Sequence, residues 1–283
     1  MPEEITIPTR YLKLAARAWG AVDALPVLAL HGWLDNAASF DRLAPLLKGV
    51  RLVALDLPGH GLSEHRPAGM HYHFIDFIQD VVAAADALNW DRFALLGHSL
   101  GAGVASFVAA TLPQRITQLA LIEGLGPLSG NPGEGPAQLA TSMTQMNQWE
   151  RKNLPVYTNV DEAARARHEL TGLSHEAAVI IAARGTKSMG SGLGWRSDPR
   201  LTLKSPIYLT EEQVLAFLGA IQAPTFLVRG ESGYLLKREF MAKRYHQVAN
   251  LTVKALPGGH HLHLENPEPV AHALNGFFET RRV

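Results

Sequence analysis

Short runs of apolar residues recur along the chain, and each run is bounded by glycine, proline or polar residues. Most runs are continuously apolar and rich in Val, Leu and Ile, which is typical of strands buried on both faces of a parallel sheet. Six such strands are predicted, at Pro26–Gly32, Val50–Gly59, Phe93–Ser99, Ile116–Gly124, Pro224–Glu231 and Leu251–Gly259. An earlier segment, Glu3–Trp19, is expected to form an antiparallel hairpin at one edge of the sheet.

Helical patterns lie between the predicted strands. The clearest are Asp76–Asn89, Leu100–Pro113 and Pro267–Arg281. Pro267 suits the first turn of its helix, because a proline there gives up no hydrogen bond. Strands that alternate with helices form βαβ units. The pattern therefore predicts an α/β fold with an open, mostly parallel twisted sheet and helices on both faces.

This alternation stops between Leu125 and about Thr210. Gly124–Pro136 opens the region with five glycines and three prolines, a composition that resists regular structure. Helical patterns follow at Ala137–Arg151, Asp161–Leu170 and His175–Arg184, and then a glycine-rich stretch at Gly185–Trp195.

Sheet elements resume after this region, and long connections within a compact domain are usually functional. We therefore expect residues 125–210 to be a helical cap inserted after the sixth strand. It would cover one end of a core domain made of residues 1–124 and 211–283. A separate second domain is the alternative.

Composition narrows the classes of partner and chemistry. The 26 basic side chains balance the 26 acidic ones, so no nucleic-acid partner is expected. The chain has no cysteine, which excludes disulfides, thiolate catalysis and cysteine–zinc sites. The first residues lack the basic and apolar regions of a signal peptide, and no apolar run is long enough to span a bilayer. We expect a cytoplasmic protein without a membrane partner.

Ser99 stands between Gly97 and Gly101, where a predicted strand meets a predicted helix. A G-x-S-x-G sequence in that context is typical of a nucleophile held in a tight, strained turn, because the glycines have no Cβ to obstruct it. The N–H of Leu100 lies at the start of the helix, where donors are unpaired and negative charge is favoured. It is predicted to bind the oxyanion that forms when Ser99 attacks a carbonyl.

A second oxyanion donor is expected in the loop that follows the first core strand. Gly32 allows a sharp turn there, and the N–H of Trp33 is the candidate donor, with His31 bracing the loop. The general base is expected late in the chain, where a loop after the last strand carries His260, His261 and His263.

A metal site is the competing interpretation of these histidines. The pair His261 and His263 has the H-x-H spacing that can bind zinc, and His71 and His73 repeat it. No carboxylate stands at a familiar ligand spacing from either pair, so the sequence favours a site without metal.

Several motifs together resemble the α/β-hydrolase fold family. They are "LHGWLDNAASFDRLAPLL", "LDLPGHGLSEH", "LLGHSLG" and "GHHLHLENPE", in the order that is usual for that family. The "HGWLDN" loop and "DPRL" at Asp198–Leu201 are similar to the serine-hydrolase-like subgroup. The resemblance implies that Ser99 is the nucleophile, that His260 is the base, and that Trp33 and Leu100 donate to the oxyanion. It also implies that residues 125–210 shape the substrate pocket.

The acid of the triad departs from the family's usual pattern. That family often places an aspartate in the loop after the seventh strand, where this chain has Gly233. Glu231 is displaced from that position by two residues. The other placement known in the family, after the sixth strand, is occupied by Glu123. We favour Glu123, because a buried carboxylate needs a partner such as an imidazole N–H, and Glu231 remains its rival.

The expected function is hydrolysis of carboxylic esters or related small acyl compounds through an acyl-enzyme, as in a carboxylesterase. No cofactor or metal is expected. Cleavage of a carbon–carbon bond, a thioester or a lactone uses the same groups and stays open. A non-catalytic binding protein and a metal-dependent hydrolase are the remaining alternatives. Met143 and Met146 are candidates to line an apolar cavity.

Overall fold

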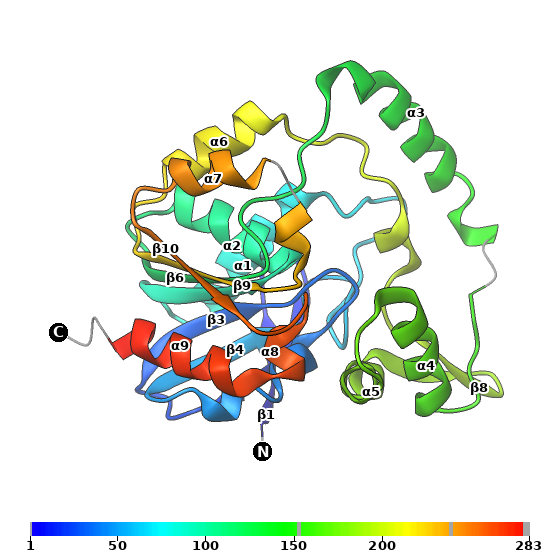
Figure 1. Cartoon of the computed structure of the whole chain (residues 1–283). Helices are drawn as coiled ribbons and strands as arrows, with labels where there is room; N and C mark the ends of the chain where they lie inside the picture. The colour runs from blue at the N-terminus through cyan, green and yellow to red at the C-terminus, as the bar shows by residue number, and fades with distance from the viewer. Residues whose placement is uncertain (1, 152–153, 238–239, 280–283) are drawn as a thin grey trace.

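The computed structural model describes residues 2–151, 154–237 and 240–279, and a twisted sheet forms its centre (Figure 1). Within these residues the sheet has eight strands in the order β1-β2-β4-β3-β5-β6-β9-β10. The strands are β1 (Glu3–Pro8), β2 (Lys13–Trp19), β3 (Leu25–Leu30), β4 (Val50–Leu55), β5 (Phe93–His98), β6 (Ile116–Ile122), β9 (Thr225–Gly230) and β10 (Leu251–Leu256). Neighbours from β4 to β10 are parallel, and the first two pairings are antiparallel. The predicted mostly parallel sheet with an edge hairpin is confirmed.

The central strands are continuously apolar because both of their faces are covered. Leu95 of β5 packs in the hydrophobic core on one face of the sheet, and its neighbour Leu96 packs in the core on the other. Both side chains are fully buried. This two-sided burial explains why these strands lack the alternation of a half-exposed sheet.

Helices cover both faces of the sheet, as predicted (Figure 1). One face carries α1 (Phe74–Ala87), α2 (Leu100–Thr111), α6 (Glu211–Gly219) and α7 (Met241–Gln247). The other face carries α8 (Leu262–Glu265) and α9 (Pro267–Glu279), with the short 3-10 turns Ala37–Phe40 and Ala44–Leu46. Among the described helices, none combines the length and the apolarity needed to cross a membrane.

The register of the parallel strands brings their carboxyl ends to one edge. Leu30 of β3 pairs with Gly97 of β5, and His98 of β5 pairs with Ile122 of β6. The loops that follow these strands therefore begin side by side, at the edge where open α/β sheets bind their ligands.

Between β6 and α6 the chain leaves the sheet and forms a segment to its right in Figure 1. This inserted segment contains α3 (Gly135–Met146), α4 (Val160–Thr171), α5 (His175–Gly185), β7 (Thr186–Met189) and β8 (Gly192–Trp195). The three expected helices are present, although α3 ends before the predicted Arg151. The β7–β8 hairpin was not predicted, because its glycines read as a loop. A Cβ on Gly192 would lie 2.4 Å from the carbonyl oxygen of Tyr157, so glycine permits this close approach.

Buried ion pairs join the inserted segment to the sheet. Arg184 at the end of α5 lies with its Nη2 2.9 Å from Oδ2 of Asp56, which follows β4. Arg167 of α4 donates to Oδ1 of Asp35, which follows β3, at 2.6 Å. Both carboxylates are buried, and a buried charge needs such a partner. The two arginines therefore fix the segment against the edge of the sheet where the site lies.

Candidate active site

Ser99 occupies the sharp turn between β5 and α2 that the sequence predicts. Its φ is 52° and its ψ is −113°, a conformation that costs free energy for a residue with a side chain. A Cβ on Gly97 would lie 2.5 Å from the carbonyl oxygen of Gly101, and one on Gly101 would lie 2.1 Å from that of Leu30. The two glycines therefore let the serine turn pack against its own helix and against β3.

His260 and Glu123 lie in line with the Ser99 hydroxyl. His260 Nε2 is 2.9 Å from Ser99 Oγ, and His260 Nδ1 is 3.3 Å from Glu123 Oε2. Because a carboxylate oxygen only accepts, the Nδ1–H donates to Glu123 and Nε2 is free to accept from the hydroxyl. Three loops that are distant in the sequence thus converge at the carboxyl edge of the sheet.

Glu123 follows β6 directly and is almost fully buried. Its φ is 51°, so a strained backbone turns this side chain toward the neighbouring loop. Its Oε1 accepts the N–H of Gly230 at 2.7 Å, and its Oε2 accepts the N–H of Tyr234 at 2.7 Å. These two backbone donors stabilise the carboxylate and hold it beside the imidazole of His260.

Gly233 explains how a glutamate from a different strand fits beside this loop. A Cβ on Gly233 would lie 2.2 Å from Oε1 of Glu123 and 2.5 Å from its Oε2. The Glu123 carboxylate therefore fills the space that a side chain at position 233 would take. Glu231, the rival acid, is exposed, and its backbone N–H donates to the carbonyl of Leu256.

Leu100 and Trp33, the residues whose N–H groups are the candidate oxyanion donors, lie at the cavity of Ser99. Leu100 is the first residue of α2, and Leu100 and Trp33 both line the cavity that contains Ser99. The Trp33 indole donates to the carbonyl of Leu201 in the inserted segment at 2.9 Å. His31 braces the Trp33 loop as expected, because its buried Nε2 accepts the N–H of Leu57 at 3.0 Å.

A cavity of about 900 Å³ opens over Ser99 and is lined mainly by apolar side chains. The inserted segment contributes part of this lining, with Leu128, Leu201, Leu203, Ile207, Tyr208 and Leu209. Met143 and Met146 do not line it, contrary to the expectation from sequence. Met143 is 57% exposed, because α3 carries it away from the sheet.

Arg244 lines this cavity, and its hydrogen bonds are already made. Its guanidinium binds both carboxylate oxygens of Glu211 at 2.8 and 2.6 Å. It also donates to the carbonyls of Leu125 and Pro127 at 2.8 and 2.9 Å. The arginine therefore anchors the start of the inserted segment, and its own charge is already paired.

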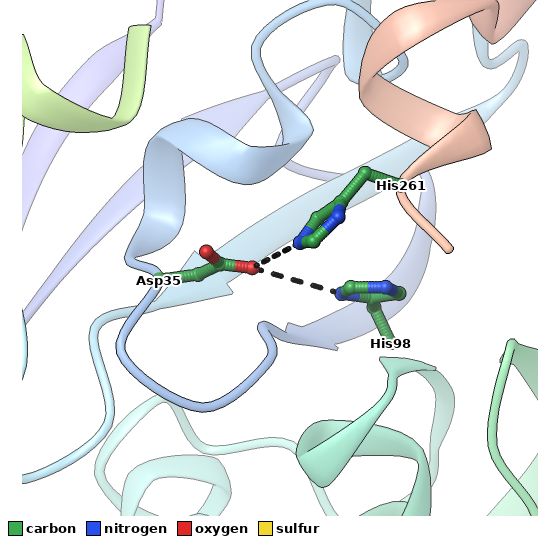
Figure 2. Close-up of side chains that lie close together, drawn as sticks. All are labelled: Asp35, His98 and His261. Atoms are coloured by element: carbon green, nitrogen blue, oxygen red, sulfur yellow. Dashed lines mark ion pairs between the residues drawn. The ribbon is translucent and has the colours of Figure 1, made fainter. Parts of the chain in front are cut away.

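His261 and His263 make contacts of their own. His263 Nε2 is 2.8 Å from Ser39 Oγ, and burial lowers the pKa of His263 to about 3. His261 Nε2 is 3.5 Å from Asp35 Oδ2, beside His98 (Figure 2). The grouping of Asp35, His98 and His261 was missed from the sequence because its members come from three distant parts of the chain, the end of β5 and the loops after β3 and β10. The only sequence signal was the proximity of each residue to a strand end.

Known proteins resemble the chain over most of its length. The family model described as alpha/beta hydrolase fold matches residues 26–267. A serine hydrolase-like protein of Dictyostelium discoideum is 35% identical, over 90% of this chain and 75% of that protein. A serine hydrolase-like protein of Danio rerio is 32% identical, over 98% of this chain and 88% of that protein.

Solved structures agree with these relatives. A crystal structure of a hypothetical protein from Pseudomonas aeruginosa PAO1 is 43% identical, with a TM-score of 0.92 over 98% of both chains. A thioesterase domain from the curacin biosynthetic pathway is 28% identical, with a TM-score of 0.86 over 99% of this chain and 100% of that domain. The chain therefore belongs to the α/β-hydrolase fold family and is a serine hydrolase-like member of it.

Proposed function

We propose that this protein hydrolyses carboxylic esters or related small acyl compounds through a Ser-His-Glu triad of Ser99, His260 and Glu123. The observation that carries the proposal is the continuous chain of contacts from the Ser99 hydroxyl, through both nitrogens of His260, to the buried Glu123 carboxylate. A nucleophile, a base and a group that orients the base are the parts that acyl transfer needs.

In the first half of the reaction, Ser99 Oγ attacks the ester carbonyl while His260 Nε2 takes the hydroxyl proton. Glu123 stabilises the imidazolium that forms, because its carboxylate faces the Nδ1–H. The N–H groups of Leu100 and Trp33 bind the oxyanion of the tetrahedral intermediate, and the start of α2 favours that negative charge. His260 then protonates the departing alcohol, and an acyl group remains on Ser99.

In the second half, water attacks the acyl carbonyl and gives its proton to His260 Nε2. The tetrahedral intermediate collapses, and Ser99 Oγ leaves and recovers the proton from His260. The products are a carboxylic acid and the free enzyme, so no cofactor enters the balance.

The cavity favours an uncharged, largely apolar acyl group. Its lining is mainly aliphatic and aromatic, and the guanidinium of Arg244 is bound to Glu211 and to carbonyls. Among the described lining residues, a substrate carboxylate would therefore meet no arginine or lysine that is free to pair with it, and burying it unpaired is costly. We assign residues 125–210 the role of a cap, because they supply part of this lining and bind Trp33 through Leu201.

Thioester hydrolysis is the second candidate. It uses the same nucleophile, base and oxyanion donors, and the 28% identical thioesterase domain resembles this chain over its whole length. A panel of p-nitrophenyl esters and matched acyl thioesters of increasing chain length separates the two activities. A carbon–carbon bond or lactone hydrolase would be inactive on that panel but would still carry a reactive serine.

The deciding experiment combines this panel with a fluorophosphonate probe on wild-type protein and on Ser99→Ala. We expect the probe to label wild-type protein at Ser99, and the substitution to abolish labelling. We expect kcat/KM to fall at least about 10³-fold, since the attacking group is lost. Near wild-type turnover by Ser99→Ala would overturn the triad. A wild-type protein that neither reacts with the probe nor turns over any substrate would support a binding role.

A further inference from the structure

Asp35, His98 and His261 form a compact cluster, and His261 directly follows His260 in the chain (Figure 2). Asp35 Oδ2 is 3.5 Å from His261 Nε2 and 3.8 Å from His98 Nδ1, and the three atoms lie within 4.8 Å of one another. Asp35 and His98 are buried, whereas the side chain of His261 is 12% exposed. The cluster is separate from the contacts that join the triad.

The hydrogen-bond pattern leaves two acceptors facing each other inside this cluster. His98 Nε2 lies 2.9 Å from the carbonyl oxygen of His260, which can only accept, so Nε2 carries the proton. His98 Nδ1 then presents a lone pair toward Asp35 Oδ2. Neither of these buried atoms makes a well-formed hydrogen bond with the described residues, and His261 Nε2 lies 3.5 Å from Asp35 Oδ2. A cation between the two acceptors would satisfy both of them.

Gly32 leaves the space in which such a group fits. A Cβ on Gly32 would lie 3.0 Å from Asp35 Oδ2 and 3.0 Å from His98 Nδ1. The missing side chain therefore keeps open the side of the cluster where these two atoms converge. The partly exposed His261 provides the approach from solvent.

We propose that Asp35 Oδ2, His98 Nδ1 and His261 Nε2 bind a divalent transition-metal cation of the Zn²⁺ class. Two imidazoles and one carboxylate are ligands that suit zinc, and three protein ligands leave its fourth position for water. Zinc bonds of about 2.0–2.1 Å place tetrahedral ligand atoms roughly 3.3 Å apart. The spacings of 3.5 and 3.8 Å from Asp35 Oδ2 lie near that value, and the cluster as a whole must contract when it binds a cation.

The surroundings of the cluster support these ligand roles. His98 donates its other ring N–H to a backbone carbonyl, which is the usual way in which proteins orient a metal-bound imidazole. Arg167 donates to Asp35 Oδ1 and leaves Oδ2 facing the imidazoles.

The proposed metal site adjoins the loop that carries His260. His261 follows His260 in the chain, and His98 Nε2 donates to the carbonyl of His260. Contraction of the cluster around a cation would therefore shift this loop, and no step of the proposed reaction passes through the metal.

The test measures binding directly on the full chain after treatment with a chelator. Zinc is titrated by calorimetry, and Co²⁺ replaces it to give the visible absorption bands of a low-coordinate site. We expect one cation per chain, and at least tenfold weaker binding in Asp35→Asn and in His261→Gln. Gly32→Ala keeps all three ligands but obstructs the space, so it should also weaken binding. His71→Gln is the matched control, because it removes a histidine of the other H-x-H pair and should leave the affinity unchanged.

A crystal of wild-type protein soaked in zinc provides a second measurement that needs no variant. An anomalous scattering peak between Asp35, His98 and His261 is the expected result. A peak at His71 and His73, or water alone in the cluster, would overturn the proposal, as would equal affinity in wild type and in folded His261→Gln. None of these measurements uses catalysis, so their failure leaves the proposed hydrolase activity untouched.

Discussion

Glu123 is the residue at which chemistry and backbone geometry depend most closely on each other. Its strained φ of 51° and the two N–H groups that it accepts hold the carboxylate next to His260. The charge therefore lies at the imidazole without any freedom to reorient. In the proposed reaction, a group held in this way acts chiefly on the transition state, because the imidazolium forms only there.

Glu123→Gln should lower kcat by about 10² or more and change KM little, since the shape is kept and the charge is removed. The amide group would also bring a donor toward the N–H of Tyr234 or of His260, which disturbs the orientation of the ring. Glu231→Gln is the matched control and should keep nearly full activity. Steady-state kinetics on the best ester decides the matter. A large loss in Glu231→Gln with little loss in Glu123→Gln would exchange the two assignments.

Single residues also show what the sequence can and cannot predict. Short motifs and strand ends predict Ser99 and His260 as candidates, and the structure brings Oγ of Ser99 and Nε2 of His260 to 2.9 Å. The choice between Glu123 and Glu231 could only be argued from burial, since the sequence does not say which carboxylate reaches the imidazole. The contact between Asp35 and His261 could not be predicted, because it depends on how loops after β3 and β10 meet in space.

Among the elements of the fold, α5 is joined to the sheet by Arg184, which binds Glu4 of β1 and Asp56, the residue after β4. Its Nε lies 3.2 and 3.0 Å from the carboxylate oxygens of Asp56, and its Nη1 lies 2.7 and 2.8 Å from those of Glu4. Asp56 is fully buried, so its charge depends on this partner and on nearby N–H groups. The inserted segment is therefore held to the sheet by an ion pair whose Asp56 carboxylate is shielded from water.

Arg184→Ala should lower the free energy of unfolding by about 3–5 kcal/mol, because it leaves a buried carboxylate uncompensated. Arg165→Ala is the control in the same segment. Arg165 pairs with Asp161 on the exposed surface of α4, and such solvent-screened pairs contribute little to stability. Urea denaturation of both variants gives the comparison. Equal stability of the two would mean that Asp56 finds sufficient partners without the arginine.

Prediction of whole elements follows from how strongly the chain is patterned. The buried strands stand out as continuous apolar runs, and the long helices stand out by their helical periodicity. Their predicted ranges agree with the structure within a few residues. The β7–β8 hairpin was not predicted, because Gly190, Gly192 and Gly194 dominate its sequence. The hairpin depends on the close approach of Gly192 to Tyr157 and of Gly194 to Met189, which no local pattern reveals.

The molecule as a whole encloses several histidines that stay neutral. Burial lowers the pKa of His60 and of His263 to about 3, and burial also lowers those of His31 and His98. In the unfolded chain each histidine titrates near pH 6.5. The unfolded state therefore binds more protons below that pH, and stability is lost as the pH falls from about 6.5 toward 3.

The free energy of unfolding should accordingly fall between pH 7 and pH 5. His60 and His263 together account for about 4 kcal/mol of this loss. Burial raises the pKa of Asp80 to about 6, so its protonation in the folded state offsets about 1.4 kcal/mol. Urea titrations at several pH values measure the slope, and folded His263→Gln should show a shallower one. Equal or greater stability at pH 5 would contradict this account.

The space at Gly233 has a consequence for how such an enzyme can diverge. The carboxylate of Glu123 and a side chain at position 233 compete for one volume, so the molecule holds an acid from one strand end or from the other. A lineage cannot pass between the two arrangements by single neutral replacements. Gaining a side chain at position 233 first displaces the resident carboxylate, and losing Glu123 first leaves His260 without its orienting group. The two positions are therefore inherited as a pair, and sequences that share this glycine should share the glutamate.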